Sequence, residues 1–106
     1  MTVQRVLIDG QWTISAGTST FQAVNPRTTE PLPESYPVSP WSEVEQVLDA
    51  ANRAAEAVRG WSGDRFAAFL DKFADRIEAR AAAIVEIANL ETALPVAPRQ
   101  QPLFRL

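Results

Sequence analysis

The chain has 106 residues, of which 46% are apolar and 22% charged, as is usual for one small folded domain. It contains neither cysteine nor histidine. This inventory excludes disulfides, thiolate nucleophiles, imidazole bases and nearly all zinc or transition-metal sites. The net charge of −3, with scattered arginines and a single lysine, argues against nucleic-acid binding. No apolar run approaches the roughly 20 residues that span a bilayer, and the start lacks the plan of a signal peptide. We therefore expect a cytoplasmic protein that binds neither nucleic acid nor membrane.

Residues 1–25 are predicted to be extended. Apolar residues alternate imperfectly with polar ones around Asp9-Gly10, a dipeptide that supplies the positive φ angles of a type I′ turn. This pattern predicts a hairpin, or two short strands that meet at the turn. A second extended stretch, 20–24, stops at Asn25-Pro26. Residues 26–41 are proline-rich, with five of the eight prolines between 26 and 40, and are expected to be loop or edge strand.

A helix is predicted over residues 42–60. Ser42 and Glu45 fit a capping box, in which the serine hydroxyl and the glutamate carboxylate each accept a hydrogen bond from the other residue's backbone amide. Gly60 is a natural stop. The apolar stripe follows the i, i+3, i+4, i+7 rule. Its members are Val44, Val47, Leu48, Ala51, Ala54, Ala55 and Val58.

Residues 62–93 are predicted to form one helix, or two helices with a bend near Arg80. Ser62 or Asp64 is the expected cap. Pro95 is expected to end the helical segment, and residues 94–106 are expected to be an irregular tail. The apolar stripe contains several aromatic residues, and its members are Phe66, Phe69, Leu70, Phe73, Ile77, Ile84, Ile87, Ala88 and Leu90.

No group of residues carries a convincing active site. The carboxylate pairs Glu43 with Glu45 and Glu86 with Glu91 are better explained as helix ends or solvated helix faces, because no histidine, lysine or cysteine stands near them to divide acid and base roles. The serines are interpreted as cap or turn residues. Aromatic residues at helical spacing usually lie in a core or an interface. We expect no catalytic, cofactor-binding or metal-binding residue within 1–106.

The order of several short motifs resembles the opening of aldehyde dehydrogenases. The first part reads Ile8-Asp9-Gly10-Gln11-Trp12, then Ala16-Gly17, Phe21, Val24-Asn25-Pro26 and Thr29-Glu30. The second part reads Ser42-Glu43-Val44-Glu45, Ala50-Ala51, Ala54-Ala55, Trp61, Arg65, Leu70, Ala74-Asp75, Ile77-Glu78 and Leu90-Glu91-Thr92. Each motif is weak alone, but their order and spacing carry the resemblance from about residue 7 to 99.

Two motifs depart from the family pattern. The segment 26–30 lacks the glycine of A-T-G-E and has Thr29 there, and the segment 91–95 has Ala93 where the family has the glycine of E-T-G-K-P. The second departure resembles the branch that acts on semialdehydes of sugar-acid breakdown. The tail 99–106 does not resemble the next segment of the family and is consistent with a frameshifted or truncated end.

The resemblance implies an α+β fragment: a short N-terminal hairpin or extended strands and two to three amphipathic helices, the first portion of an aldehyde-dehydrogenase-like α/β fold. The intact parent would oxidise an aldehyde or semialdehyde to the acid with NAD or NADP, as a homo-oligomer. The family's nicotinamide-binding sheet, cofactor lysine, oxyanion-hole asparagine, general-base glutamate and nucleophilic cysteine all lie beyond the matched region. This chain alone is therefore expected to bind no cofactor and to be catalytically inactive.

Two interpretations remain open for the apolar helix stripes. If the chain is a fragment, the stripes would cover part of the cofactor domain, and the partner would be the rest of the enzyme chain or other subunits. In this chain some stripe residues would then be partly exposed, namely Val47, Phe66, Phe69 and Phe73. Alternatively, the chain is a free-standing helical-hairpin module that binds another protein through the same stripes.

Overall fold

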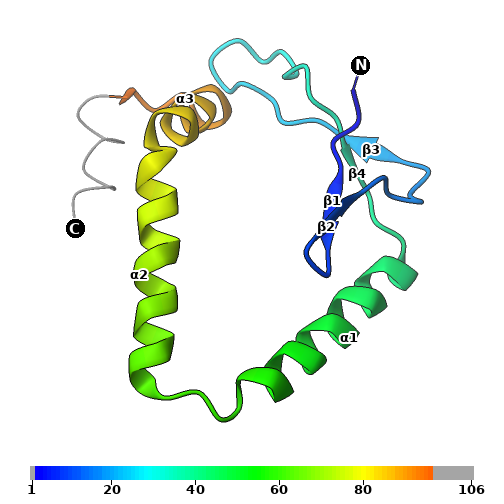
Figure 1. Cartoon of the computed structure of the whole chain (residues 1–106). Coiled ribbons are helices and arrows are strands. Elements are labelled where there is room, and N and C mark those ends of the chain that lie inside the picture. Colours follow the sequence, from blue (N-terminus) through cyan, green and yellow to red (C-terminus); the bar gives the residue numbers. More distant parts are fainter. Residues whose placement is uncertain (1, 97–106) are drawn as a thin grey trace. The chain divides into compact units, whose positions relative to one another are not determined.

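The computed structural model describes residues 2–96 (Figure 1). The chain divides into two compact units, which are considered separately. The first unit comprises Met1–Ala23 and Pro31–Gly60, and the second comprises Val24–Glu30 and Trp61–Leu106. Short antiparallel strands belong to the first unit, and helices follow them along the chain. This order confirms the predicted α+β class.

The first unit opens with a β-hairpin. Strands β1 (Val6–Ile8) and β2 (Gln11–Thr13) are antiparallel, with Ile8 opposite Gln11. Asp9 and Gly10 connect them with φ angles of 49° and 76°. Both angles are positive, as a type I′ turn requires, and this turn matches the right-handed twist of the strands. The hairpin predicted from Asp9-Gly10 is confirmed.

A second pair of strands joins the start of the chain to the proline-rich stretch. Strand β3 (Thr20–Phe21) pairs antiparallel with β4 (Tyr36–Pro37), and the rings of Phe21 and Tyr36 lie 5.5 Å apart. Proline cannot donate to a strand ladder, so Pro37 suits a short strand at an edge. The expectation of loop or edge strand in this stretch is met.

The first helix, α1, spans Trp41–Val58, and the capping box predicted at its start is wrong. Pro40 is the N-cap, and no side chain caps the helix. The Pro40 carbonyl accepts hydrogen bonds from the amides of Glu43 and Val44 at 3.0 and 3.4 Å. The helix begins one residue before Ser42, and Glu45 accepts a hydrogen bond at 3.0 Å from the indole Nε1 of Trp41, one turn earlier. Ser42 therefore lies inside the first turn, where its hydroxyl cannot act as an N-cap.

The second unit contains two helices that meet at Arg80. Helix α2 spans Gly63–Ala79, and its N-cap Ser62 accepts a hydrogen bond from the Arg65 amide at 3.2 Å. Of the two predicted caps, Ser62 is confirmed, and Asp64 lies in the first turn. Arg80, with φ −111° and ψ 13°, leaves helical geometry, and α3 (Ala81–Thr92) begins directly after it. Figure 1 shows that α3 turns away from the direction of α2. This change of direction is the bend predicted near Arg80.

Helix α3 ends in a left-handed residue. Ala93 has a φ of 58°, and its amide donates to the Asn89 carbonyl at 2.9 Å. The side-chain amide of Asn89 then donates to the Leu94 carbonyl at 2.7 Å. Pro95 follows, where a helix could not continue. The irregular tail predicted over 94–106 lies mostly outside the described residues.

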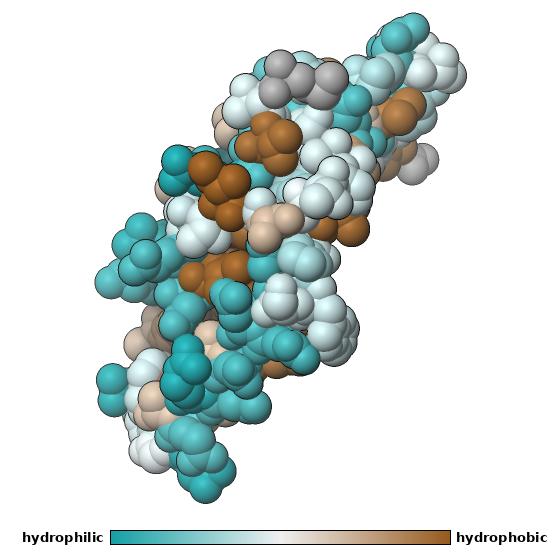
Figure 2. Space-filling model, turned by 90° about the vertical axis from the view of Figure 1, so that its right-hand side faces the viewer, coloured by the Kyte–Doolittle hydropathy of each residue, from teal (hydrophilic) through white to brown (hydrophobic). Residues whose placement is uncertain are grey.

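Little of either unit is buried. Among residues 2–96, Val85 is the apolar residue that counts as buried, and Ser35 and Glu43 are the buried polar residues. Figure 2 shows one face of the molecule, on which apolar side chains reach the surface as separate patches among hydrophilic ones. None of the helices described here combines the length and hydropathy needed to cross a membrane.

Candidate functional site

The best-defined cluster of polar groups surrounds Glu43 in the first turn of α1. Its Oε2 accepts a hydrogen bond from the Ser15 hydroxyl at 2.7 Å, and its Oε1 accepts one from the Ala16 amide at 2.6 Å. Ser39, just before the helix, is a third hydrogen-bond partner. The Ser15 hydroxyl in turn accepts from the Gly17 amide at 3.0 Å. Glu43 thus joins the connection between β2 and β3 to the helix.

These hydrogen bonds favour the ionised form of the carboxyl. The backbone amide of Ala16 makes the largest contribution, and the hydroxyls of Ser15 and Ser39 add to it. Together they hold the pKa of Glu43 below its usual value of 4.5, although partial burial acts in the opposite direction. A carboxylate whose ionised form is stabilised by several donors is poorly suited to transfer protons near neutral pH. These contacts favour a structural role over general acid–base catalysis.

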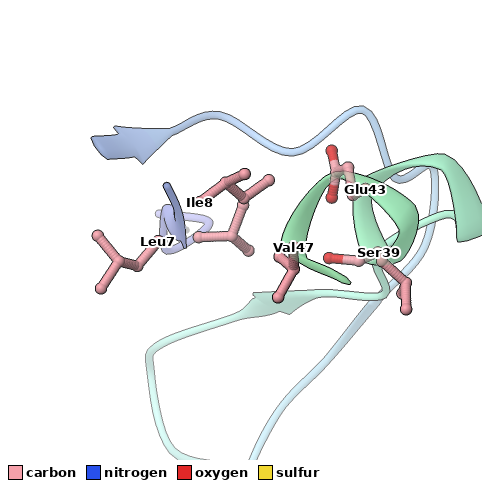
Figure 3. Close-up of a pocket in the computed structure, with 7 residues that line it drawn as sticks. Leu7, Ile8, Ser39, Glu43 and Val47 are labelled. Atoms are coloured by element: carbon pink, nitrogen blue, oxygen red, sulfur yellow. The ribbon is translucent and has the colours of Figure 1, made fainter. Parts of the chain in front are cut away.

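A shallow groove lies beside this carboxylate, between β1 and α1. Its volume is about 210 Å³, and its lining comes from Val6, Leu7, Ile8, Ser39, Glu43, Val44 and Val47. Figure 3 shows Ile8 and Val47 in the space between strand and helix, with Leu7 on the other side of the strand. The lining is mostly apolar, and Glu43 is its one ionisable side chain. The groove therefore favours apolar contact over catalysis.

The sequence predicts Glu43 and Glu45 at a helix end or on a solvated face, and the structure places Glu43 at the helix end but buries it. Glu43 is only 7% exposed, whereas Glu45 is exposed and bound to Trp41. The reason is that Ser15 and Ala16, more than 25 positions earlier, supply donors that offset the cost of burying the charge. Local sequence patterns hold no signal for such distant partners. Glu86 and Glu91 are exposed, as expected for residues on a solvated helix face.

The serines also differ among themselves. Ser62 is a cap and Ser15 accepts from the amide two residues later, as cap and turn residues do. Ser15 also binds Glu43, and Ser35 is 2% exposed at a parallel bridge with Val3. The interpretation of every serine as a cap or turn residue is therefore incomplete, because two of them stabilise contacts between distant segments.

The second unit presents a different surface, which we call the aromatic face of α2. Phe69 and Phe73 are 56% and 57% exposed, and their rings stack 6.4 Å apart. The face comprises Phe66, Phe69, Leu70, Phe73 and Ile77, all of them exposed to between 36% and 61%. Soluble monomers rarely expose so many adjacent large apolar side chains without a binding partner. Val47 in α1 is also 44% exposed.

The start of the aromatic face is ordered by a small aromatic cluster. The Arg65 guanidinium lies 4.0 Å from the centre of the Trp61 ring, and the rings of Trp61 and Phe66 are 5.4 Å apart. A cation over an indole face is attracted by the ring quadrupole. The cluster therefore holds Trp61, the residue before the Ser62 cap, against the first turn of α2.

The described residues do not fit a dinucleotide or a metal. Within them each sheet has two antiparallel strands, and no strand leads through a glycine-rich turn into a helix. A nicotinamide dinucleotide is held at such a turn, beside a parallel sheet. No three carboxylate, histidine or cysteine side chains between residues 2 and 96 are placed together to hold an ion.

These features define a class: an α+β segment with ordered local structure and apolar helix faces that lack a covering layer. The sequence model of the aldehyde dehydrogenase family matches residues 12–102. The chain is also 33% identical over 95 residues to alpha-ketoglutaric semialdehyde dehydrogenase 2 of Azospirillum brasilense. The chain belongs to the aldehyde dehydrogenase family.

The two proteins differ greatly in length. The similarity covers 89% of this chain but only 18% of the Azospirillum protein. The family predicted from the motifs between residues 7 and 99 is confirmed, with closely similar bounds. The semialdehyde in the relative's name agrees with the branch suggested by the segment 91–95.

Proposed function

We propose that this chain is the N-terminal part of an NAD(P)-dependent aldehyde dehydrogenase that acts on a semialdehyde. The reaction converts the aldehyde, one water molecule and NAD(P)⁺ into the carboxylic acid, NAD(P)H and a proton. The family match over residues 12–102 carries the proposal, and the name of the Azospirillum relative supports the choice of a semialdehyde. The intact enzyme is proposed to be a cytoplasmic homo-oligomer.

On this proposal, the chain alone has no dehydrogenase activity. Oxidation through a thiohemiacetal needs a cysteine thiolate and an oxyanion hole, and the sequence contains no cysteine. The antiparallel two-stranded sheets give a nicotinamide cofactor no binding edge. Catalysis and cofactor binding are therefore assigned to parts of the enzyme outside this chain.

The role proposed for the chain is to supply a packing layer. The aromatic face of α2 and the exposed apolar residues of α1 would be covered by the rest of the enzyme. Several large aromatic side chains would each remove considerable apolar surface from water, which is the main favourable contribution to such packing. The exposure of Phe69 and Phe73 supports this role.

A chimeric enzyme tests the proposal. The segment of the Azospirillum dehydrogenase that matches this chain is replaced by residues 12–102, the range of the family match. NAD(P)H formation from alpha-ketoglutaric semialdehyde is then measured for the chimera and for the 106-residue chain alone. We expect a soluble, active chimera and no turnover above background by the chain. A chimera that fails to fold, or turnover by the chain alone, would contradict the proposal.

The alternative is a free-standing module that binds another protein through its helices. The same exposed aromatic face favours it. A monomeric chain with a cooperative thermal transition and no binding of a hydrophobic dye would support the module. Dye binding, self-association or a non-cooperative melt would support the packing layer of a larger enzyme.

A further inference from the structure

We propose that Glu43 is a positioning residue, whose carboxylate latches the connection between β2 and β3 onto the first turn of α1. We call residues 15–17 together with Glu43 the carboxylate latch. Both carboxylate oxygens are used, one by the Ser15 hydroxyl at 2.7 Å and one by the Ala16 amide at 2.6 Å. The Ser15 hydroxyl oxygen also accepts a hydrogen bond from the Gly17 amide at 3.0 Å. Three consecutive residues thus depend on a single side chain.

The position of the latch gives it a wider effect within the first unit. The latched residues lead from the β1–β2 hairpin into β3, and Ser39, which also binds Glu43, leads from β4 into α1. The Ser19 carbonyl accepts a hydrogen bond from the Val38 amide at 2.9 Å, so the same two connections meet again nearby. A β-carbon added to Gly17 would collide with the Val38 carbonyl. The connections that lead into β3 and into α1 are therefore in close contact at this junction.

Glu43 is the one ionisable side chain among the residues that line the groove, and a further charged contact, between α1 and the hairpin, is the exposed pair of Arg53 with Asp9. The segments packed around it contribute Ser15, Ala16 and Ser39 as donors, and the remaining groove residues, from β1 and α1, are apolar. Glu45, the nearest carboxylate on the same helix, is exposed and bound to Trp41. Since no other ionisable side chain lines the groove, acid-induced opening of the latch would report the protonation of Glu43.

The direction of the pH effect follows from the hydrogen bonds. They hold the pKa of Glu43 below the 4.5 of an unconstrained glutamate. The stabilisation is therefore fully present above pH 4.5 and is lost as the pH falls through the lower pKa of the folded state. The latch is closed at neutral pH and opens in acid.

Hydrogen exchange of the full 106-residue chain tests the proposal. Protection of the Ala16 and Gly17 amides is measured by NMR from neutral pH to below pH 4.5. In Glu43→Ala, both amides should exchange about tenfold faster or more, because the local opening no longer breaks hydrogen bonds to the carboxylate. The amides of α1 beyond its first turn should keep their protection. Glu45→Ala is the matched control and should change neither loop amide.

Two further variants separate charge from geometry. Glu43→Gln keeps an acceptor for the Ala16 amide, so the loop should stay protected at neutral pH but should no longer open in acid. Ser15→Ala should expose the Gly17 amide more than the Ala16 amide. Unprotected Ala16 in the unsubstituted chain, unchanged exchange in Glu43→Ala, loss of protection throughout α1, or unaltered acid opening in Glu43→Gln would each overturn the latch.

Discussion

The two units of this chain hold their helices in different ways. In the first unit, α1 is tied to distant residues by specific polar contacts: Glu43 with the 15–17 connection, and Arg53 with Asp9 at 3.0 Å. In the second unit, α2 is shaped by local signals such as the Ser62 cap, while its aromatic face remains exposed. Helix formation and helix burial are thus separate problems. The local sequence of the second unit is sufficient to form its helices, whereas burial of the aromatic face of α2 depends, on the proposed function, on another protein surface.

The two places where this sequence departs from the family pattern also distinguish the units. Thr29 and Ala93, which replace family glycines, both belong to the second unit and have φ angles of 61° and 58°. Glycine enters this left-handed region without steric cost, whereas a residue with a β-carbon does not. The second unit therefore carries backbone strain that the family pattern avoids.

Among single substitutions in the isolated chain, the largest effect is expected at Gly17 in the first unit. Gly17→Ala places a β-carbon against the Val38 carbonyl, and overpacking of this kind costs about 1–3 kcal/mol. Gly60→Ala is the matched control, because a β-carbon there meets nothing within 4 Å and φ is not positive. Chemical denaturation followed by circular dichroism should show the loss for Gly17→Ala and little change for Gly60→Ala. Equal effects would show that the first unit does not depend on this junction.

The next largest effect is expected from removing a serine hydroxyl at the start of α2, in comparison with the same change at the start of α1. Ser62→Ala removes the oxygen that accepts from the Arg65 amide and should cost about 1 kcal/mol. Ser42→Ala should be close to neutral, because Ser42 lies inside the first turn of α1 and Pro40 is the N-cap. The free energies of unfolding of the two variants show which serine hydroxyl stabilises its helix. A larger loss for Ser42→Ala would restore the capping box that the structure rejects.

A gain in stability is expected where the family has glycine. Ala93→Gly and Thr29→Gly should each stabilise the chain by about 0.5–1 kcal/mol, because relief of the left-handed strain exceeds the added freedom of the unfolded chain. Thr28→Gly is the control beside Thr29, since it adds the same freedom without relieving a positive φ, and it should destabilise. Thermal unfolding midpoints check all three. Destabilisation by Ala93→Gly would contradict the left-handed helix end.

The smallest effect concerns the ion pair between Arg53 and Asp9. Both side chains are about two thirds exposed, at 65% and 66%, and exposed pairs contribute at most about 1 kcal/mol. Arg53→Ala should therefore lower stability slightly, and the difference should vanish in high salt. Arg59→Ala, which removes an exposed pair with Glu56 of α1, is the control. A salt-insensitive loss would show that Arg53 acts by packing.

The sequence predicts those features that depend on neighbouring residues. The Asp9-Gly10 turn, the Ser62 cap and the break at Arg80 all follow from local dihedral preferences or hydrogen bonds. The burial of Glu43 escapes prediction because two of its three hydrogen-bond partners, Ala16 and Ser15, are 27 and 28 positions away. The helical periodicity of the sequence places Glu43 on the polar side of the helix. It carries no information about the distant donors that offset the cost of burying its charge. The capping box at Ser42 fails because the helix begins one residue earlier, at Trp41. Pro40 is therefore the N-cap, and no side chain caps the helix.

The resemblance to aldehyde dehydrogenases predicts what local chemistry cannot. The residues themselves indicate only what the chain lacks, namely cysteine and histidine. The family comes from the order of motifs and is confirmed by the match over residues 12–102. The proposed function then gives the exposed aromatic face a physical reason, because the rest of the enzyme would cover it.

The proposal that the rest of the enzyme covers the aromatic face of α2 is tested most directly by one double variant, measured in two proteins. The double variant Phe69→Ala with Phe73→Ala is made both in the isolated chain and in the chimeric Azospirillum enzyme, and the free energy of unfolding is measured in each. The control is the double variant Lys72→Ala with Arg76→Ala, which changes exposed positions of α2. In the isolated chain, the phenylalanine pair should cost only about 1 kcal/mol, from the stacked rings. In the chimera it should cost several kcal/mol, approaching the roughly 3–5 kcal/mol per buried phenylalanine, while the control pair costs little in either. An equally small loss in both contexts would contradict the assignment of the aromatic face as an interior surface of the enzyme.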